Sequence, residues 1–495
     1  MSRINTNIQS LTARRALDLN NASLNQALQR LSTGLRINSG RDDPAGLIAS
    51  ETLRSSLRAT DTAIDNATRA DTIVAVAEGG LQEVSSLLLN LENLIDQTAN
   101  EAGLTPEEIS ANQQQIDSIL ASINRLAEAT AFGNKRLLNG TLDFTTSGIN
   151  ITESTGAAVT HLNKVQINAA KIPSGSFRQV TVAVVAASKI AVASTVLAGT
   201  NSSGVRNGTL KGVTTIQITG NLGTETLSFA SGTTAASIAT SIRGSSQLTG
   251  ISATASAATG GPASLVLQST AFGLDQFVSV SVLQNASTAF VAQAADTKKF
   301  GTDGTVTING ANAVVKGLDV SVNAASLSLD LALTSTFGSV AGGTSSFEIK
   351  GGGAVFSISP TVGLSGQETL GIGEVSAAKL GNAGVGFLAS LSTGLTNGLA
   401  SKNFSTAQRI VRASIDQVAK LRGRLGGFQK NTLASTINSL RVARENVTAA
   451  ESAIRDADFA SETSSLTRSQ ILVAASTNTL RLANAAPQNV LSLLQ

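Results

Sequence analysis

Apolar residues recur at alternating intervals of three and four along the first part of the chain. The positions are Leu53, Leu57, Ile64, Ala67, Val74, Ala77, Leu81, Val84, Leu88, Leu91 and Ile95. Two polar residues, Thr60 and Asp71, interrupt the series. This spacing, kept over several heptads, is typical of a coiled-coil helix. We expect one helix over 44–98, roughly 80 Å long at 1.5 Å per residue.

Helix-start signals precede this helix and the next one. Pro44 follows two aspartates, which predicts an N-cap with proline at the first helical position. Thr105, Pro106 and Glu108 form the pattern of a capping box. The helix that follows is expected to fold back antiparallel on the first. It carries an apolar stripe at Ile109, Ile116, Ile119, Ile123 and Leu126.

The last part of the chain repeats the helical pattern in two stretches. One seam comprises Val418, Leu421, Leu425 and Phe428, and the other comprises Leu433, Ile437, Leu440, Val447 and Ile454. The phase slips between them, near Gly426-Gly427. A bundle of two long helices from the front of the chain and one from the back would bury all these stripes.

The stretch from about 131 to 403 differs in kind and indicates strands and turns. Residues 214–232, 304–315 and 346–359 alternate apolar and polar positions around glycines, which predicts hairpins. Residues 234–244 predict a short helix, and 251–269 return to strand spacing. Large apolar residues are few, so we expect several small β-rich modules with a Ser/Thr-rich surface that faces solvent.

Both ends of the chain carry apolar stripes without the dense charged face of a free-standing helix. The positions expected to drive self-assembly are Ile4, Ile8, Leu11, Leu24, Leu28, Leu31, Leu35, Phe459, Leu466, Leu480, Val490, Leu491 and Leu494. A two-helix hairpin buries only one stripe of each helix. We therefore predict an open, heterologous self-assembly in which neighbouring copies cover ends that are disordered in the isolated chain. The alternative, in which both ends lie on the chain's own bundle, stays open.

Composition narrows the class of protein. The 495 residues include no Cys, Trp or Tyr, one Met and one His; 14% are charged, and the net charge is +3. Without cysteine there are no disulfides or thiolate metal sites. Without basic runs or abundant stacking aromatics, nucleic acid is a poor candidate partner. The sequence offers no apolar signal-peptide core and no long apolar run for a spanning helix, which by itself would indicate a cytosolic protein.

No residue pattern indicates catalysis. His161 is the only histidine, so an H-E-x-x-H zinc site cannot form, and we expect His161 to be exposed in a hairpin loop. The sequence contains no G-x-S-x-G and no phosphate-binding loop. Asp42 and Asp43 are adjacent at a helix start, where carboxylates act as caps. We expect no enzyme, no cofactor and no metal site.

Two runs of sequence are similar to a known family. Residues 28–58, "LQRLSTGLRINSGRDDPAGLIASETLRSSLR", resemble the N-terminal signature of bacterial flagellin, and 407–495 resemble its C-terminal domain, in the same order. Residues 211–283 resemble, more weakly, a small repeat module inserted in flagellins and some hook proteins. Residues 351–381 resemble the return segment of long flagellins.

The resemblance implies an α+β fold: a discontinuous all-α coiled-coil bundle of paired N- and C-terminal helices, with inserted β-rich outer domains. Residues 1–42 with 456–495 would form a terminal-helix core domain, the inner tube of a filament. Residues 43–176 with 402–455 would form a helical bundle domain with a β-hairpin, the outer tube. Residues 177–401 would form variable β-rich surface domains.

The resemblance also implies a function. The chain would be a flagellin that polymerises head-to-tail into the helical filament of the bacterial flagellum for swimming motility. It would leave the cell unfolded through the flagellar type III export apparatus, with an export chaperone on its C-terminal helix, and become part of an extracellular filament. Hook-associated and cap proteins would meet the filament ends; nucleic acid binding and membrane insertion are not expected. Arg41, Asp42, Asp43 and Pro44 would belong to a spoke between the innermost helix and the bundle.

In many flagellins a Toll-like receptor contacts a leucine, an arginine and a glutamate of the first bundle helices. The leucine position corresponds to Leu88, but the other two positions hold Asn90 and Gln115. Losing two charged anchors from an interface typically costs several kcal/mol. We expect weak or absent sensing by that receptor.

Two other classes remain open. A hook–filament junction protein would share the terminal helices but assemble as one ring layer. A secreted coiled-coil adhesin would use the insert as a binding module. Within the filament interpretation, adhesion or O-glycosylation through the Ser/Thr-rich surface is a hypothesis.

Overall fold

The computed structural model describes most of the chain, and its residues form two compact units. The described residues are 6–100, 103–148, 150–152, 158–173, 176–197, 209–210, 212–256, 263–285, 290–292, 298–324, 326–382 and 384–492. Within them, the first unit contains residues 6–71, 357–366 and 428–492, and the second contains 72–356 and 367–427.

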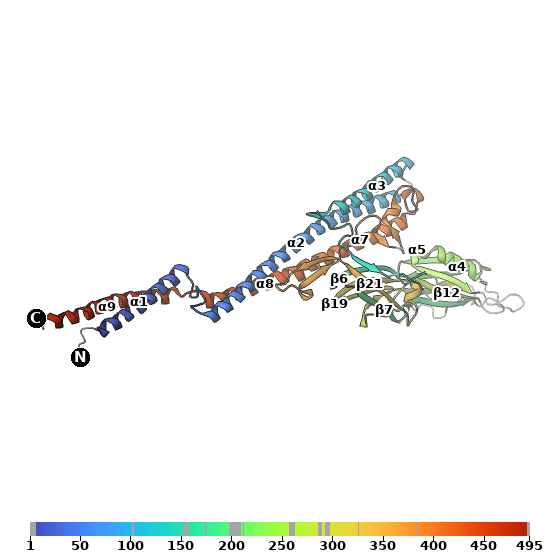
Figure 1. Cartoon of the computed structure of the whole chain (residues 1–495). Helices are drawn as coiled ribbons and strands as arrows, with labels where there is room; N and C mark the ends of the chain where they lie inside the picture. Colours follow the sequence, from blue (N-terminus) through green and yellow to red (C-terminus); the bar gives the residue numbers. More distant parts are fainter. Residues whose placement is uncertain are drawn as a thin grey trace. The chain divides into compact units, whose positions relative to one another are not determined.

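The long helices come from both ends of the sequence (Figure 1). They are α1 (Ile8–Thr33), α2 (Pro44–Thr98), α3 (Pro106–Ala129), α7 (Phe404–Gly427), α8 (Ala434–Arg455) and α9 (Phe459–Ser492). The expected helix over 44–98 is confirmed. So is the capping box at the start of α3, where Thr105 accepts from the Glu108 amide and Glu108 accepts from the Thr105 amide.

In the second unit, three helices present buried residues at alternating spacings of three and four. On α2 these are Val74, Ala77, Leu81, Val84, Leu88, Leu91 and Ile95, each at most 1% exposed. The α3 series is Gln113, Ile116, Leu120, Ile123 and Ala127, and the α7 series is Ala407, Val411, Ser414, Val418, Leu421 and Leu425. Ion pairs from Arg422 to Glu78 (2.8 Å) and from Arg412 to Glu92 (2.7 Å) fix α7 antiparallel to α2. This is the knobs-into-holes spacing of a helical bundle.

In the first unit, the α2 seam follows a different phase from the expected one. Thr60, Ala63, Ala67 and Ala70 are buried, and they continue the spacing without a break into Val74. Leu53, Leu57 and Ile64 are only half-buried, so the prediction that Ile64 lies on the seam is wrong. Asp71 does not interrupt the seam, because the seam passes through its neighbour Ala70. The Asp71 carboxylate lies beside the seam, where its Oδ1 accepts from Gln429 Nε2 at 3.1 Å. Small residues form the buried face of this part of α2, so a seam predicted from large apolar side chains is placed wrongly.

The phase slip expected near Gly426-Gly427 is confirmed as a π-helical turn, η5 (Phe428–Leu433). Leu425 and Leu433 are both buried and lie eight residues apart, and Leu440 follows seven residues later. A π turn accommodates one extra residue, so the seam of α8 resumes one position out of step with that of α7. Phe428, expected on the α7 seam, is half-buried.

One β core of the second unit lies between two sheets. The first sheet has the order β17-β16-β7-β21-β3 and the second β18-β19-β20-β6. Their bounds are β3 (Phe144–Ser147), β6 (Leu162–Ala170), β7 (Arg178–Ala186), β16 (Thr305–Ile308), β17 (Ala311–Asn312), β18 (Val314–Lys316), β19 (Asp319–Ala324), β20 (Leu327–Leu333) and β21 (Thr344–Gly352). Their inward-facing residues, among them Val180, Leu329 and Phe347, form one cluster.

A second β core lies within residues 190–301, which we call the α4 lobe. Its sheets have the orders β10-β9-β13-β15 and β11-β12-β8-β14. The bounds are β8 (Ile190–Leu197), β9 (Thr214–Gly220), β10 (Thr224–Phe229), α4 (Ala235–Gly244), α5 (Ser246–Thr249), β11 (Ile251–Ser256), β12 (Ala263–Phe272), β13 (Phe277–Asn285), β14 (Phe290–Ala292) and β15 (Lys299–Phe300). The hairpin, short helix and strands predicted within 214–269 are confirmed. The chain enters and leaves the lobe at neighbouring residues, Lys189 and Thr302, which exchange backbone hydrogen bonds of 2.8 and 3.0 Å.

The hairpin predicted over 346–359 is wrong. Strand β21 pairs with β7 and β3, whereas β22 (Ala354–Ser357) pairs with β23 (Gln367–Leu370). Three consecutive glycines, 351–353, have φ of 133°, 99° and 77°, which only glycine adopts without strain, and they direct the chain away from the sheet. The short elements are β1 (Ala131–Phe132), β2 (Lys135–Arg136), β4 (Asn150–Thr152), β5 (Ala158–Thr160), α6 (Ser335–Gly338), η2 (Leu364–Gly366), β24 (Gly381–Asn382), β25 (Gly386–Phe387), η3 (Leu388–Leu391) and η4 (Leu399–Ser401).

Residues 371–399 return along the helices as a strap whose backbone is bound by helix side chains. Gln113 accepts from Leu399 N (2.7 Å) and donates to Leu391 O (2.9 Å). Gln417 accepts from the Gly381 amide through Oε1 and donates to the Gly381 carbonyl through Nε2. The side-chain amide thus takes the place of a backbone partner in a neighbouring strand. These amides satisfy backbone groups that would otherwise be buried unpaired. Residues 371–381 of the strap lie within the stretch that resembles the return segment of long flagellins; residues 382–399 and the amide-to-backbone bonds were not predicted.

Two further residue-level findings concern expected features. His161 is half-buried and stacks on Phe337 with ring centroids 4.5 Å apart, so the prediction of an exposed loop residue is wrong.

Among the described residues, α2 alone has the length and mean hydropathy (1.2) of a helix that could cross a membrane. The buried seam contributes to this apolar composition, as in the core helix of a bundle.

Adjacent leucines on α2 provide a test of the seam. Leu88 is fully buried and Leu89 is 51% exposed. Leu88→Ala should lower the free energy of unfolding by about 2–5 kcal/mol, because it leaves a cavity between helices. Leu89→Ala should change it by no more than about 0.5 kcal/mol. Urea denaturation followed by circular dichroism measures both; equal losses would contradict the assigned seam.

Candidate functional site

The two terminal helices, α1 and α9, run antiparallel side by side (Figure 1). Polar side chains and one ion pair set their register. The contacts are Asn7 Nδ2 to Ala483 O at 2.7 Å, Asn20 Nδ2 to Ser476 Oγ at 2.7 Å, and Arg30 Nη1 to Glu462 Oε1 at 2.9 Å. Residues from opposite ends of the sequence thus form one helical hairpin, which we call the terminal hairpin.

The terminal hairpin buries little of its own apolar surface. The buried side chains of its described residues are small: Ala13, Ala27, Ser469 and Ala483, each 4–8% exposed. Large apolar side chains stay in water: Ile8 (59% exposed), Leu11 (60%), Leu19 (62%), Leu28 (46%), Phe459 (73%), Ile471 (64%), Leu472 (44%) and Leu482 (74%). An exposed apolar surface of this kind marks an interaction site.

The predicted assembly residues divide into three groups. Exposed on the terminal hairpin are Ile8, Leu11, Leu28 and Phe459. Half-buried are Leu24, Leu31, Leu35, Leu466 and Leu480. Ile4 and Leu494 lie outside the described residues; Val490 and Leu491 lie within α9, but their side chains are outside the description. Leu19, Ile471, Leu472 and Leu482 are exposed although they were not among the predicted positions.

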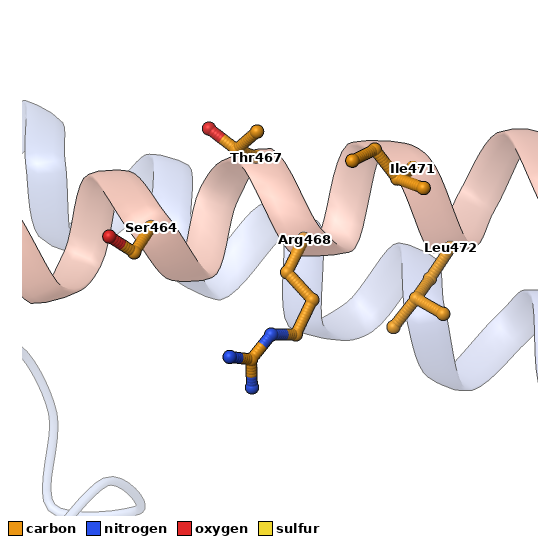
Figure 2. Close-up of a pocket in the computed structure, with 5 residues that line it drawn as sticks. All are labelled: Ser464, Thr467, Arg468, Ile471 and Leu472. Atoms are coloured by element: carbon orange, nitrogen blue, oxygen red, sulfur yellow. The ribbon is translucent and has the colours of Figure 1, made fainter.

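An open groove lies along α9. It is lined by Ser464, Thr467, Arg468, Ile471 and Leu472, and Figure 2 shows Arg468 and Leu472 extending from the same edge of the helix. The groove therefore combines aliphatic side chains with one guanidinium group.

A neck joins α1 to α2 and α8 to α9. Gly34 ends α1 in the left-handed region (φ 72°), and its carbonyl accepts from the Ala457 amide at 2.9 Å. Arg36 donates its amide to Arg455 O (2.7 Å) and its Nη2 to Ile454 O (2.6 Å). The two crossing segments are thus bound to each other by their backbones.

Ile37 anchors the neck, with 1% of its surface exposed. A Cβ on Gly46 would lie 2.6 Å from Ile37 Cδ1, so a larger residue there would force the Ile37 side chain to move. Glu51, on the next turns of α2, bonds to Arg54 (2.8 Å) and Arg455 (3.1 Å), and these partners lower the pKa of its carboxyl, Arg54 most.

The predicted spoke residues have distinct contacts. Asp43 Oδ1 accepts from the Gly46 amide at 2.9 Å and is the N-cap of α2. Asp42 instead accepts from the Ser39 amide (2.8 Å) and hydroxyl (3.0 Å) and from the Asn38 amide (3.1 Å), and these hydrogen bonds lower the pKa of Asp42. Arg41 and Pro44 are exposed.

The receptor positions require a correction. Leu88 is completely buried in the α2 seam, so its side chain cannot contact a receptor while the bundle is folded. The resemblance placed the leucine on a core residue, and the exposed neighbour is Leu89. Asn90 and Gln115 are both exposed, on α2 and α3.

The described residues form an α+β chain whose two ends pair in one helical hairpin and whose central part is rich in β-strands. Two family models match these ends. The model described as "Bacterial flagellin N-terminal helical region" matches residues 4–143, and "Bacterial flagellin C-terminal helical region" matches residues 409–494.

Curated relatives agree with the family models. Flagellin E of Vibrio cholerae serotype O1 is 39% identical over 156 residues, which are 32% of this chain and 40% of that protein. The chain thus spans less than half of this relative's length. Flagellin D of Vibrio anguillarum is 27% identical and B-type flagellin of Pseudomonas aeruginosa is 29% identical, each over 99% of both chains. The chain belongs to the bacterial flagellins, a family of structural proteins.

The Asp43 cap can be separated from the Asp43 charge. Asp43→Ala removes the acceptor for the Gly46 amide and should cost about 1 kcal/mol of helix stability. Asp43→Asn retains an acceptor and should cost much less. Hydrogen exchange at the first turn of α2 reports the loss; equal exchange in both variants would assign the stabilising role to the charge.

Proposed function

We propose that this chain is the structural subunit that polymerises head-to-tail into the helical filament of the bacterial flagellum and so serves swimming motility. The observation that carries the proposal is the terminal hairpin, which exposes large aliphatic side chains on both of its helices. Burying apolar surface gains about 25 cal/mol per Å², so covering these faces with other copies favours assembly strongly.

Assembly and folding of the ends are coupled in this proposal. Ordering a residue costs roughly 1–2 kcal/mol of backbone entropy. The small buried side chains and half-buried leucines of the described hairpin offset only part of that cost. The ends of an isolated chain are therefore disordered, and they order when neighbouring copies cover them. This arrangement keeps subunits apart before export and joins them in the filament.

The parts of the chain take the places that the family implies. Residues 1–42 with 456–495 form the inner tube, 43–176 with 402–455 form the outer tube, and 177–401 face outward. The neck, including Arg41 to Pro44, acts as the spoke. The subunit passes through the flagellar export apparatus with a chaperone on its C-terminal helix, and meets cap and hook-associated proteins at the filament ends. It has no catalytic role, binds no cofactor or nucleic acid, and does not insert into a membrane.

Electron microscopy and proteolysis test this function together. Purified monomer should form long filaments under polymerising conditions, whereas a junction protein should stop at short rings and an adhesin should not assemble. Trypsin should remove about the first and last forty residues from the monomer and leave them intact in filaments, because helical pairs this poorly buried unfold locally. Rigid, protease-resistant ends in dilute monomer would overturn the proposal.

We further propose that the Toll-like receptor senses this protein weakly. Asn90 and Gln115 replace two charges, and both are exposed where a receptor could reach them. In a cell reporter assay, Asn90→Arg with Gln115→Glu should raise the potency of the monomer at least tenfold, since each restored charge pair is worth roughly 1 kcal/mol or more. Full potency of the unmodified monomer would contradict this expectation.

A further inference from the structure

Most arginines of the terminal hairpin form no ion pair with another described residue. Arg30 pairs with Glu462 at 2.9 Å. Within the described residues, no ion pair is formed by Arg14, Arg15, Arg468 or Arg481. In water such a charge is hydrated and costs nothing. On a face that another chain covers, it loses water and needs a carboxylate.

Arg468 lies on such a face. Residues three and four positions apart on a helix are neighbours, so Arg468 adjoins Ile471 and Leu472, which are 64% and 44% exposed. The three line the groove on α9 (Figure 2). Any chain that covers these aliphatic side chains also covers the guanidinium group. Arg481 differs, because its neighbours at the same spacings include Thr477, Asn478 and Asn484.

The carboxylates near the hairpin leave one candidate partner. Glu462 is engaged by Arg30, and Asp458 caps α9 by accepting from the Ala460 amide at 2.9 Å. Asp18 on α1 is exposed, and among the described residues it has no hydrogen bond or ion pair. Arg14 and Arg15, four and three residues before Asp18, have this carboxylate on their own helix, but neither forms an ion pair with it among the described residues. Arg468 has no carboxylate at a comparable spacing on α9.

Asp18 and Arg468 cannot meet within one chain. The contacts of Asn20 with Ser476 and of Arg30 with Glu462 place Asp18 opposite about residue 475 of α9. Arg468 lies about seven residues further along, roughly 10 Å at 1.5 Å per residue. A contact between them therefore requires a second copy that is shifted along the helix axis.

We propose that Arg468 is a specificity-determining residue of self-assembly, and that it binds the carboxylate of Asp18 from a second copy of this chain. The inference rests on the proposed filament function and deepens it. The aliphatic faces drive association without direction, and the charge pair fixes the axial register at which two hairpins pack, because a copy in another register buries Arg468 unpaired.

Charge reversal tests the pair in the full-length chain. Arg468→Glu and Asp18→Arg should each raise the critical concentration for polymerisation at least tenfold, measured by light scattering and electron microscopy. The double variant, which restores opposite charges, should return to within about threefold of the wild type, since oppositely charged partners reverse equivalently. The control charge reversal, Lys350→Glu at an exposed position of β21 in the insert that is proposed to face outward, should polymerise like the wild type. Circular dichroism of each monomer should be unchanged.

The outcomes separate this inference from the function on which it rests. If the wild type forms no filaments, the filament function fails. If the wild type and Arg468→Glu polymerise equally, the filament function stands and the charge pair is wrong. If both single variants fail and the double variant is not restored, Arg468 and Asp18 do not pair with each other.

Discussion

Burial at the two ends of the chain is the constraint on which the rest depends. Among the described residues, the hairpin of α1 and α9 buries only alanine and serine side chains, half-buries several leucines, and leaves other large side chains such as Ile8, Leu19 and Phe459 exposed to water. Such a pair gains too little apolar burial to offset the entropy of ordering two long helices. In the proposed filament, other copies cover these side chains, which would explain the apolar sequence at the ends.

The bundle, in contrast, is complete within one chain. Its seams on α2, α3 and α7 are almost fully buried, and ion pairs such as Arg422 with Glu78 flank them. Where the C-terminal helices change phase, the π turn at 428–433 takes up one residue and lets both seams stay buried. The amides of Gln113 and Gln417 bind the returning strap by its backbone. Because the bundle buries its own seams, its fold does not depend on whether the terminal hairpin is ordered.

Much of this fold could be predicted because its signals are periodic and local. The 3–4 spacing predicted α2 to the residue, and Thr105 with Glu108 predicted the start of α3. The errors arose where small residues or long-range pairing decided the outcome. Ala63 and Ala70 set the seam instead of Ile64, and three glycines sent β22 to β23. The hydrogen bonds that hold the strap could not be foreseen, because amide-to-backbone bonds between residues far apart in sequence leave no local pattern. At the site, exposure of Ile8 and Leu11 agrees with the expected stripe, while Leu88 is a core residue.

The α4 lobe departs from and rejoins the chain at Lys189 and Thr302, which are already hydrogen-bonded to each other. Its core cluster is formed by residues of its own strands and of α4, together with Leu210. An insertion with adjoining ends imposes no strain on its host, so evolution can lengthen it, shorten it or exchange it for another module. The same geometry suits protein engineering: a foreign domain with closely spaced termini, grafted between these two residues, would be displayed once per subunit along a repeating lattice.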